Sequence, residues 1–75
     1  MNVDEIVKRI KSMDYDWVDL YTACDDKIEV SVNKYIDDDH NTELDSWFVS
    51  DEVFDIDELY DMLIANDINV EDVYY

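Results

Sequence analysis

Polar residues at every second position from Asp37 to Asp45 have the spacing of a calcium-binding loop. The residues at the alternate ligand positions of such a loop would be Asp37, Asp39, Asn41, Glu43 and Asp45. Two required residues are absent, because Thr42 stands where the sharp turn needs glycine and Phe48 stands where a bidentate glutamate closes the site. We therefore expect a solvated acidic loop, and neither a metal ion nor another cofactor.

The residue types that catalysis needs are scarce. His40 is the only histidine and Cys24 the only cysteine, and no motif brings them together. Nucleophilic or proton-transfer chemistry needs a partner held by a base and an orienting group, and the carboxylates are too numerous to single out one acid–base pair. Because the chain has no glycine, it also has no glycine-rich phosphate loop. We expect a protein that is not an enzyme, with His40 exposed in a loop and Cys24 in a turn.

The composition predicts one small acidic domain, residues 1–75, which is 48% hydrophobic. That share is too high for a disordered acidic tail. We find no apolar run long enough to span a membrane and no secretory signal. A single cysteine cannot form an internal disulfide, which fits a reducing compartment, so a cytoplasmic location is expected.

The first part of the chain predicts a helix and two strands that must position these acids. Apolar residues recur at helical spacing over residues 2–13, and Asn2 can cap that helix with Glu5 three residues later. Hydrophobic and polar residues alternate over residues 16–23 and again over residues 28–36, which predicts an antiparallel hairpin. In the absence of glycine, Asp and Asn must make the turns.

The second part predicts a strand, a helix and a tail. A polar loop at residues 37–42 precedes a strand over 43–50 and a helix over 56–65, whereas residues 68–75 fit either a short edge strand or a helical turn. The predicted fold is α+β: a three-stranded antiparallel sheet with two helices on one face, in the order α-β-β-β-α with a short C-terminal tail. The predicted cap and staple of the second helix are Asp55 with Glu58 and Phe54 with Leu59.

Acidic residues are concentrated in the second half of the chain. Residues 1–34 carry eight acids and all five bases, a net charge of −3, whereas residues 35–75 carry fourteen acids and no base, a net charge of −14. Solubility is reached in a small domain with a net charge of about 2–8. Adaptation to high salt would spread the acids over the whole chain. The asymmetry therefore favours a specific anionic surface.

Such a surface can imitate nucleic acid. A DNA strand has one charge per about 3.4 Å, while alternate residues of a strand lie about 6.6 Å apart and residues one helical turn apart about 5–6 Å. Carboxylates that share a face of a rigid frame can therefore imitate a row of phosphates before a basic DNA-binding protein, whereas direct nucleic-acid binding is disfavoured. The acids predicted to contact this partner are Asp37, Asp38, Asp39, Glu43, Asp45, Asp51, Glu52, Asp55, Asp57, Glu58 and Asp61.

Two aromatic residues are further candidates for partner contact. Trp17 and Tyr21 share one side of their predicted strand with Asp19, opposite the apolar side. With both helices on one face, the other face of the sheet stays open, and exposed aromatic residues commonly anchor interfaces.

The opening MNVDEIVKRIKSMDYD resembles the N-terminus of a small phage-encoded anti-CRISPR family that inhibits Cas9. The matching residues are Met1, Asn2, Ile6, Lys8, Ile10, Lys11, Asp14 and Tyr15. The resemblance implies a DNA mimic that occupies the groove where Cas9 reads the PAM and blocks target DNA binding. It also implies contacts from Asp14, from Asp37 to Asp39 and from the acids between Glu52 and Asp61, and action in the cytosol of a bacterial host.

Other interpretations remain open. An immunity protein that neutralises a basic nuclease toxin would also present an acidic face, and other phage DNA mimics act on restriction enzymes. A calcium-responsive module is a further alternative, which saturable calcium binding would favour.

Overall fold

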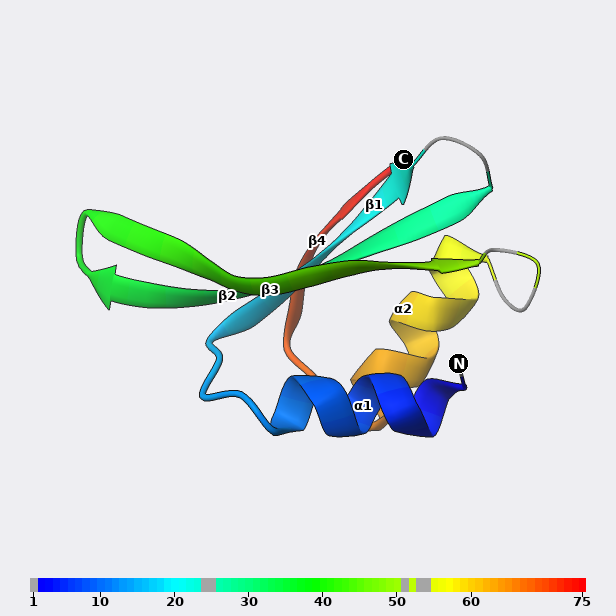
Figure 1. The fold of residues 1–75 in the computed structure, drawn as a ribbon, viewed down its shortest axis with the longest axis horizontal. Helices are drawn as coiled ribbons and strands as arrows, with labels where there is room; N and C mark the ends of the chain where they lie inside the picture. The colour runs from blue at the N-terminus through cyan, green and yellow to red at the C-terminus, as the bar shows by residue number, and fades with distance from the viewer. Residues whose placement is uncertain (1, 24–25, 51, 53–54) are drawn as a thin grey trace.

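A sheet of four strands with both helices against one face forms the body of the protein in the computed structural model (Figure 1). The structure describes residues 2–23, 26–50, 52 and 55–75. The elements are α1 (Val3–Lys11), β1 (Trp17–Ala23), β2 (Lys27–Asp37), β3 (His40–Ser50), α2 (Ile56–Ala65) and β4 (Val70–Tyr74). The strands lie in the order β3-β2-β1-β4, with β1, β2 and β3 antiparallel in turn and β4 parallel to β1. The α+β class predicted from the sequence is confirmed.

Both helices begin at the predicted capping residues. The Asn2 Oδ1 atom accepts a hydrogen bond from the Glu5 backbone N–H at 3.0 Å, and Asp55 Oδ1 accepts one from the Glu58 backbone N–H at 2.9 Å. Each bond satisfies an amide that the start of a helix leaves without an intrahelical partner. Four residues named in the sequence analysis lie outside the described part of the chain: Met1, Cys24, Asp51 and Phe54.

The C-terminal tail is a fourth strand, so the predicted sheet of three antiparallel strands is incomplete. The valines of β4, Val70 and Val73, are three positions apart, a spacing that fits a helix better than a strand. The register between β1 and β4 shifts between Val18 and Asp19, so that Val18 lies opposite Val70 and Asp19 lies opposite Asp72. Because of this irregularity, both valines pack against the core although the strand does not alternate.

The predicted polar loop at residues 37–42 is a turn of two residues. Strand β2 continues to Asp37 and β3 begins at His40, which leaves Asp38 and Asp39 between the paired strands. The alternating acids after the turn therefore lie along a strand, not around a metal-binding loop. Because β1 pairs with β2 only as far as Asn33, the hairpin extends beyond the rest of the sheet and forms one end of the molecule (Figure 1).

Aspartate adopts the left-handed conformation at two turns, as expected for a chain without glycine. The φ angles are 57° at Asp26 and 62° at Asp67. After α2, the Asp67 N–H donates to the Ile64 carbonyl at 3.1 Å and the Ile68 N–H donates to the Leu63 carbonyl at 3.0 Å. These two bonds form a Schellman motif, with Asp67 at the position that glycine most often occupies.

The core lies between the helices and one face of the sheet. Ile6 and Ile10 of α1 and Leu59 and Leu63 of α2 are fully buried there. The alternation predicted for β1 to β3 is confirmed, since the strand residues in this core are Val18, Leu20, Ile28, Val30, Val32, Trp47 and Val49. In the described part of the chain no element covers the opposite face, which we call the open face (Figure 1).

Candidate functional site

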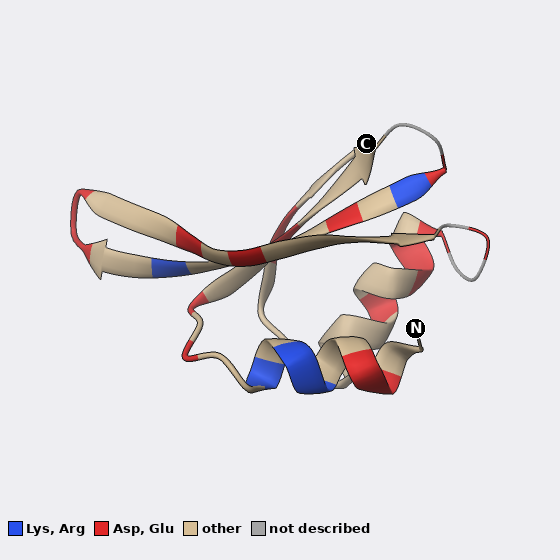
Figure 2. Ribbon diagram, viewed as in Figure 1, with Lys and Arg blue, Asp and Glu red and all other residues tan. Residues whose placement is uncertain are grey.

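The turn of the β2–β3 hairpin presents three consecutive exposed carboxylates, Asp37, Asp38 and Asp39, at one end of the molecule (Figure 2). Asp37 Oδ1 lies 2.8 Å from Nδ1 of His40 and accepts a hydrogen bond from the Asp39 backbone N–H at 2.9 Å. These contacts, with His40 the stronger, hold the pKa of Asp37 below its ordinary value. His40 is exposed, as expected, but it is the first residue of β3 and does not lie in a loop. The tip therefore projects three carboxylates into solvent, and the lowered pKa of Asp37 favours its ionised form.

A second group of carboxylates lies on α2, toward the opposite end of the long axis (Figures 1 and 2). Asp57, Glu58 and Asp61 are exposed, and the last turn of the helix contains no base. Asp55 is exposed too, but its carboxylate caps the helix. The Tyr75 hydroxyl donates to Asp57, whose carboxylate raises the pKa of Tyr75 and joins the end of the chain to α2.

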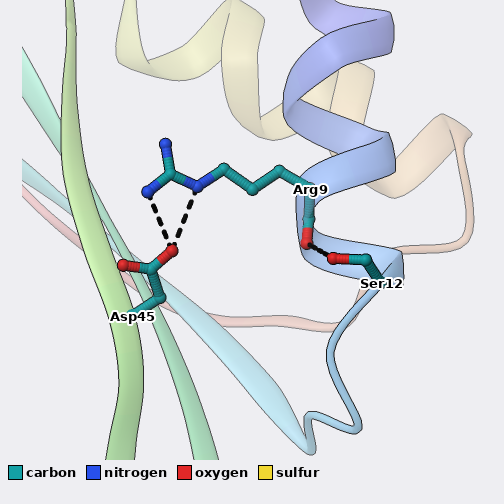
Figure 3. Close-up of polar contacts among 3 residues, drawn as sticks. All are labelled: Arg9, Ser12 and Asp45. Atoms are coloured by element: carbon teal, nitrogen blue, oxygen red, sulfur yellow. Dashed lines mark hydrogen bonds and ion pairs between the residues drawn. The ribbon is translucent and has the colours of Figure 1, made fainter.

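Asp45, one of the predicted contact residues, is engaged within the protein. Both Nε and Nη2 of Arg9 donate to Asp45 Oδ2, at 3.0 and 2.8 Å (Figure 3). The guanidinium carbon of Arg9 lies 3.9 Å from the ring centre of Trp47, and the Ser12 hydroxyl donates to the Arg9 carbonyl at 2.7 Å. The ion pair of Asp45 with Arg9 therefore joins β3 to α1 and stabilises the fold.

Asp14 and Glu43 also have partners inside the chain. Asp14 Oδ2 accepts a hydrogen bond from Lys34 Nζ at 3.0 Å, although the Asp14 side chain is 96% exposed. Such an exposed ion pair is weak, so Asp14 stays available to a partner. Glu43 Oε1 accepts a hydrogen bond from the Ser31 hydroxyl at 2.7 Å, which directs Glu43 to the open face.

The predicted contact acids consequently do not share one face, and that expectation is wrong. One group, Asp37 to Asp39, lies at the hairpin tip, and another lies on α2 toward the other end of the molecule (Figure 2). Glu43 faces the open face, whereas Asp45 is on the helix-covered side, opposite Val32. Glu52, between β3 and α2, is exposed. The anionic character of the protein is distributed along its length.

The open face has a regular arrangement of aromatic and acidic residues. Cross-strand pairing aligns Phe48, Glu29, Tyr21 and Tyr74 in one row, and Ser46, Ser31, Asp19 and Asp72 in the next. The rings of Tyr21 and Tyr74 stack with their centroids 4.7 Å apart and their planes 8° from parallel. Of the residues in the aromatic row, sequence reasoning singled out Tyr21 alone. Strand alternation alone could also have placed Phe48 and Glu29 on this face. Tyr74 could not have been placed there without the register between β4 and β1.

Trp17, the other aromatic candidate, lies beneath Tyr35. Their ring centroids are 4.4 Å apart, and Trp17 is 8% exposed whereas Tyr35 is 54% exposed. A partner that approached this part of the open face would therefore meet mainly Tyr35. Tyr35 follows Asn33 by two positions on β2, and Asn33 lies opposite Trp17, so strand alternation alone could have identified it.

Asp19 lies buried within the open face, with 9% of its surface exposed. Its Oδ2 atom accepts a hydrogen bond from Trp17 Nε1 at 3.1 Å, whereas Oδ1 has no hydrogen-bond partner among the described residues. Burial raises the pKa of Asp19 and the nearby charge of Asp72 raises it further, whereas the Trp17 hydrogen bond and the backbone N–H of Asp72 act to lower this pKa. An unsatisfied buried carboxylate oxygen is costly to a fold.

Comparisons with protein-family models, with curated proteins and with solved structures found no match for this chain. Within the described ranges, no helix is long and apolar enough to cross a membrane, and no three His, Cys, Asp or Glu residues are grouped as metal ligands would be.

Proposed function

We propose that this protein is a DNA mimic that occupies the nucleic-acid-binding site of a basic protein and keeps nucleic acid out. The observation that carries the proposal is the density of charge along the molecule. The described residues include 20 of the 22 acids and all five bases, and they lie along a longest dimension of 37 Å, which is one acid per about 1.9 Å and one net charge per about 2.5 Å, compared with about 1.7 Å in duplex DNA.

The distribution of the acids is compatible with this role. The acids do not form the single row on one face that would imitate one DNA strand, so the proposed mimicry rests on charge spread along the length of the molecule, as phosphates are spread along a duplex. Carboxylates at the hairpin tip and on α2 extend the charge toward both ends of the long axis (Figure 2). One of the five bases, Arg9, is held by Asp45 through two hydrogen bonds, so it offers little repulsion to a basic partner.

The proposed target is a Cas nuclease, on the strength of the resemblance between residues 1–16 and the anti-CRISPR family. There the protein would occupy the site in which arginines read the PAM and would exclude target DNA sterically and electrostatically. Long-range attraction would speed the encounter, and salt would weaken it.

A displacement assay tests this proposal. A fluorescent PAM-containing duplex is bound to a purified Cas9–guide RNA complex, and the protein is added at about 0.1 M and about 0.5 M salt. We expect displacement at low salt that weakens steeply at high salt. A polyglutamate peptide of equal net charge is the control, because it carries the charge without the fold. Displacement no better than that peptide's would contradict mimicry of Cas9-bound DNA by a folded surface.

A second candidate is an immunity protein for a basic nuclease toxin. The aromatic rings of the open face favour it, because tight protein pairs are anchored by buried aromatic residues more than by charge alone. The same assay with a panel of purified nuclease toxins separates the two candidates. Inhibition of one toxin at about 0.5 M salt, without displacement of DNA from Cas9, would favour immunity.

A further inference from the structure

Two pairs of residues lie next to each other on β1 and β4. Tyr21 stacks on Tyr74, and two positions earlier along both strands Asp19 lies opposite Asp72. We propose that these four residues, the tyrosine–carboxylate site, receive an arginine side chain from an exposed segment of the basic partner. The inference rests on the proposed function, because it names the surface on which that partner would dock.

Because the two rings stack on each other, the ring face that a guanidinium can reach is the outer face of Tyr74, at the edge of the sheet. The rings are within 8° of parallel, and Tyr74 is 47% exposed at the edge of the sheet. A guanidinium is planar and stacks on aromatic faces, whereas an ammonium is a compact and strongly hydrated charge. Such a pair of rings therefore favours arginine over lysine.

The carboxylate pair provides the acceptors. Asp19 is more than nine-tenths buried and its Oδ1 atom has no hydrogen-bond partner among the described residues, while the neighbouring Asp72 is exposed. A guanidinium has five N–H donors in a fixed fork, so one that stacks on Tyr74 can donate to the adjacent carboxylates. The unsatisfied Oδ1 atom of Asp19, together with the acidic charge around it, is an acceptor that a cationic donor would satisfy.

The electrostatic potential of the open face is negative and therefore also favours an arginine side chain. Burial and then the charge of Asp19 raise the pKa of Tyr21, and Asp72 is the main reason that the pKa of Tyr74 is raised. Glu29, opposite Tyr21 on β2, adds to this negative potential. Nucleic acid and a second copy of this chain, with its net charge of −17, would both be repelled. A cationic protein segment is the occupant that fits.

Titration with two short fluorescent peptides tests the site. One alternates arginine with glycine and the other alternates lysine with glycine. We expect the arginine peptide to bind about two- to fivefold more tightly, which is the range that an exposed cation–π contact supplies. The Tyr21→Leu/Tyr74→Leu variant should lose this preference. The Glu58→Gln/Asp61→Asn variant on α2 is the control, which should weaken both peptides alike and keep the preference.

Backbone amide shifts in NMR spectra locate the bound peptide. Shifts centred on β1 and β4 support the site, whereas shifts centred on α2 or the hairpin tip overturn it, as does equal binding of the two peptides. Should the double leucine variant fail to fold, Asp72→Asn keeps both rings and should weaken the arginine peptide more than the α2 control does. If the parent protein binds the two peptides equally but still displaces DNA, only this site is overturned. If the parent protein prefers the arginine peptide but does not displace DNA, only DNA mimicry is overturned.

Discussion

Arg9 on α1 and Asp45 on β3, 36 positions apart in the sequence, meet through two hydrogen bonds to one carboxylate oxygen (Figure 3). The guanidinium also covers the face of Trp47, so one side chain connects the helix layer to the edge of the sheet by charge and by packing.

We expect a measurable coupling between Arg9 and Asp45. In a double-mutant cycle with Arg9→Met and Asp45→Asn, the coupling free energy of unfolding should be about 0.5–1 kcal/mol, at the upper end for partly exposed pairs because two hydrogen bonds form. Urea unfolding measures it. The matched cycle with Lys34→Met and Asp14→Asn should give a smaller value, because the Asp14 side chain is 96% exposed. Equal coupling in both cycles would show that the Arg9 pair is no more than a surface contact.

Asp67→Gly should stabilise the protein. Asp67 has a φ of 62° at the C-terminal end of α2, where glycine has no steric penalty, so the free energy of unfolding should rise by about 0.5–1 kcal/mol. Thermal unfolding tests this, with Asp67→Ala as the comparison because alanine cannot relax into that conformation without cost. A glycine variant less stable than the parent would mean that the Asp67 side chain contributes more than the backbone strain removes.

The stability of Asp19→Asn should depend on pH in a defined direction. Because burial raises the pKa of Asp19 in the folded protein, folding favours its protonated form. That contribution is complete below the unfolded pKa of about 3.9 and is lost as the pH rises through the folded pKa. The asparagine variant is neutral throughout, so its stability relative to the parent should increase between about pH 3 and about pH 7.

Asp37→Asn provides a control of opposite sign for that pH series. Its contact with His40 lowers the pKa of Asp37, so the ionised form stabilises the fold above the unfolded pKa and the benefit is lost as the pH falls through the folded pKa. Relative to the parent, this variant should therefore lose stability as the pH rises. Urea unfolding at several pH values follows both variants, and parallel curves for the two would contradict the assignment of opposite pKa shifts.

Neutralising the hairpin tip should affect partner binding strongly, and it should lower stability by no more than Asp37→Asn alone does. Asp37→Asn, Asp38→Asn and Asp39→Asn together remove three exposed charges, and asparagine can still accept the hydrogen bond from the Asp39 amide at the turn. We expect a clear loss of affinity with little change in Tm. The charge-matched control combines Glu52→Gln, Glu58→Gln and Asp61→Asn. Intact affinity together with a lower Tm would assign the tip a structural role.

Local sequence patterns predicted much of this fold. The caps at Asn2 and Asp55, the alternation of β1 to β3 and the aspartate turns all follow from interactions within a few residues. The predicted loop was too long because the preference of Asp37 and His40 for a turn was weaker than the stabilisation from continued strand pairing.

What the sequence did not reveal depends on contacts between distant residues. Strand β4 was ambiguous because the register shift at Val18 and Asp19 breaks its alternation. The pairing of Asp45, whose side chain is 34% exposed, depends on Arg9, which the sequence places far away. Likewise, the division of the acids between the tip and α2 follows from the projection of the hairpin, a property of the whole sheet.

The strand order leaves β3 and β4 at the margins of the sheet, each with a row of backbone groups free to pair outside it. Both edge strands carry acidic residues, among them Glu43 on β3 and Glu71 on β4. Two copies of this protein that approach through these edge strands therefore bring like charges together, which opposes strand pairing between them. The charge that we propose to attract a basic target should thus also oppose self-association and fibril growth at high concentration.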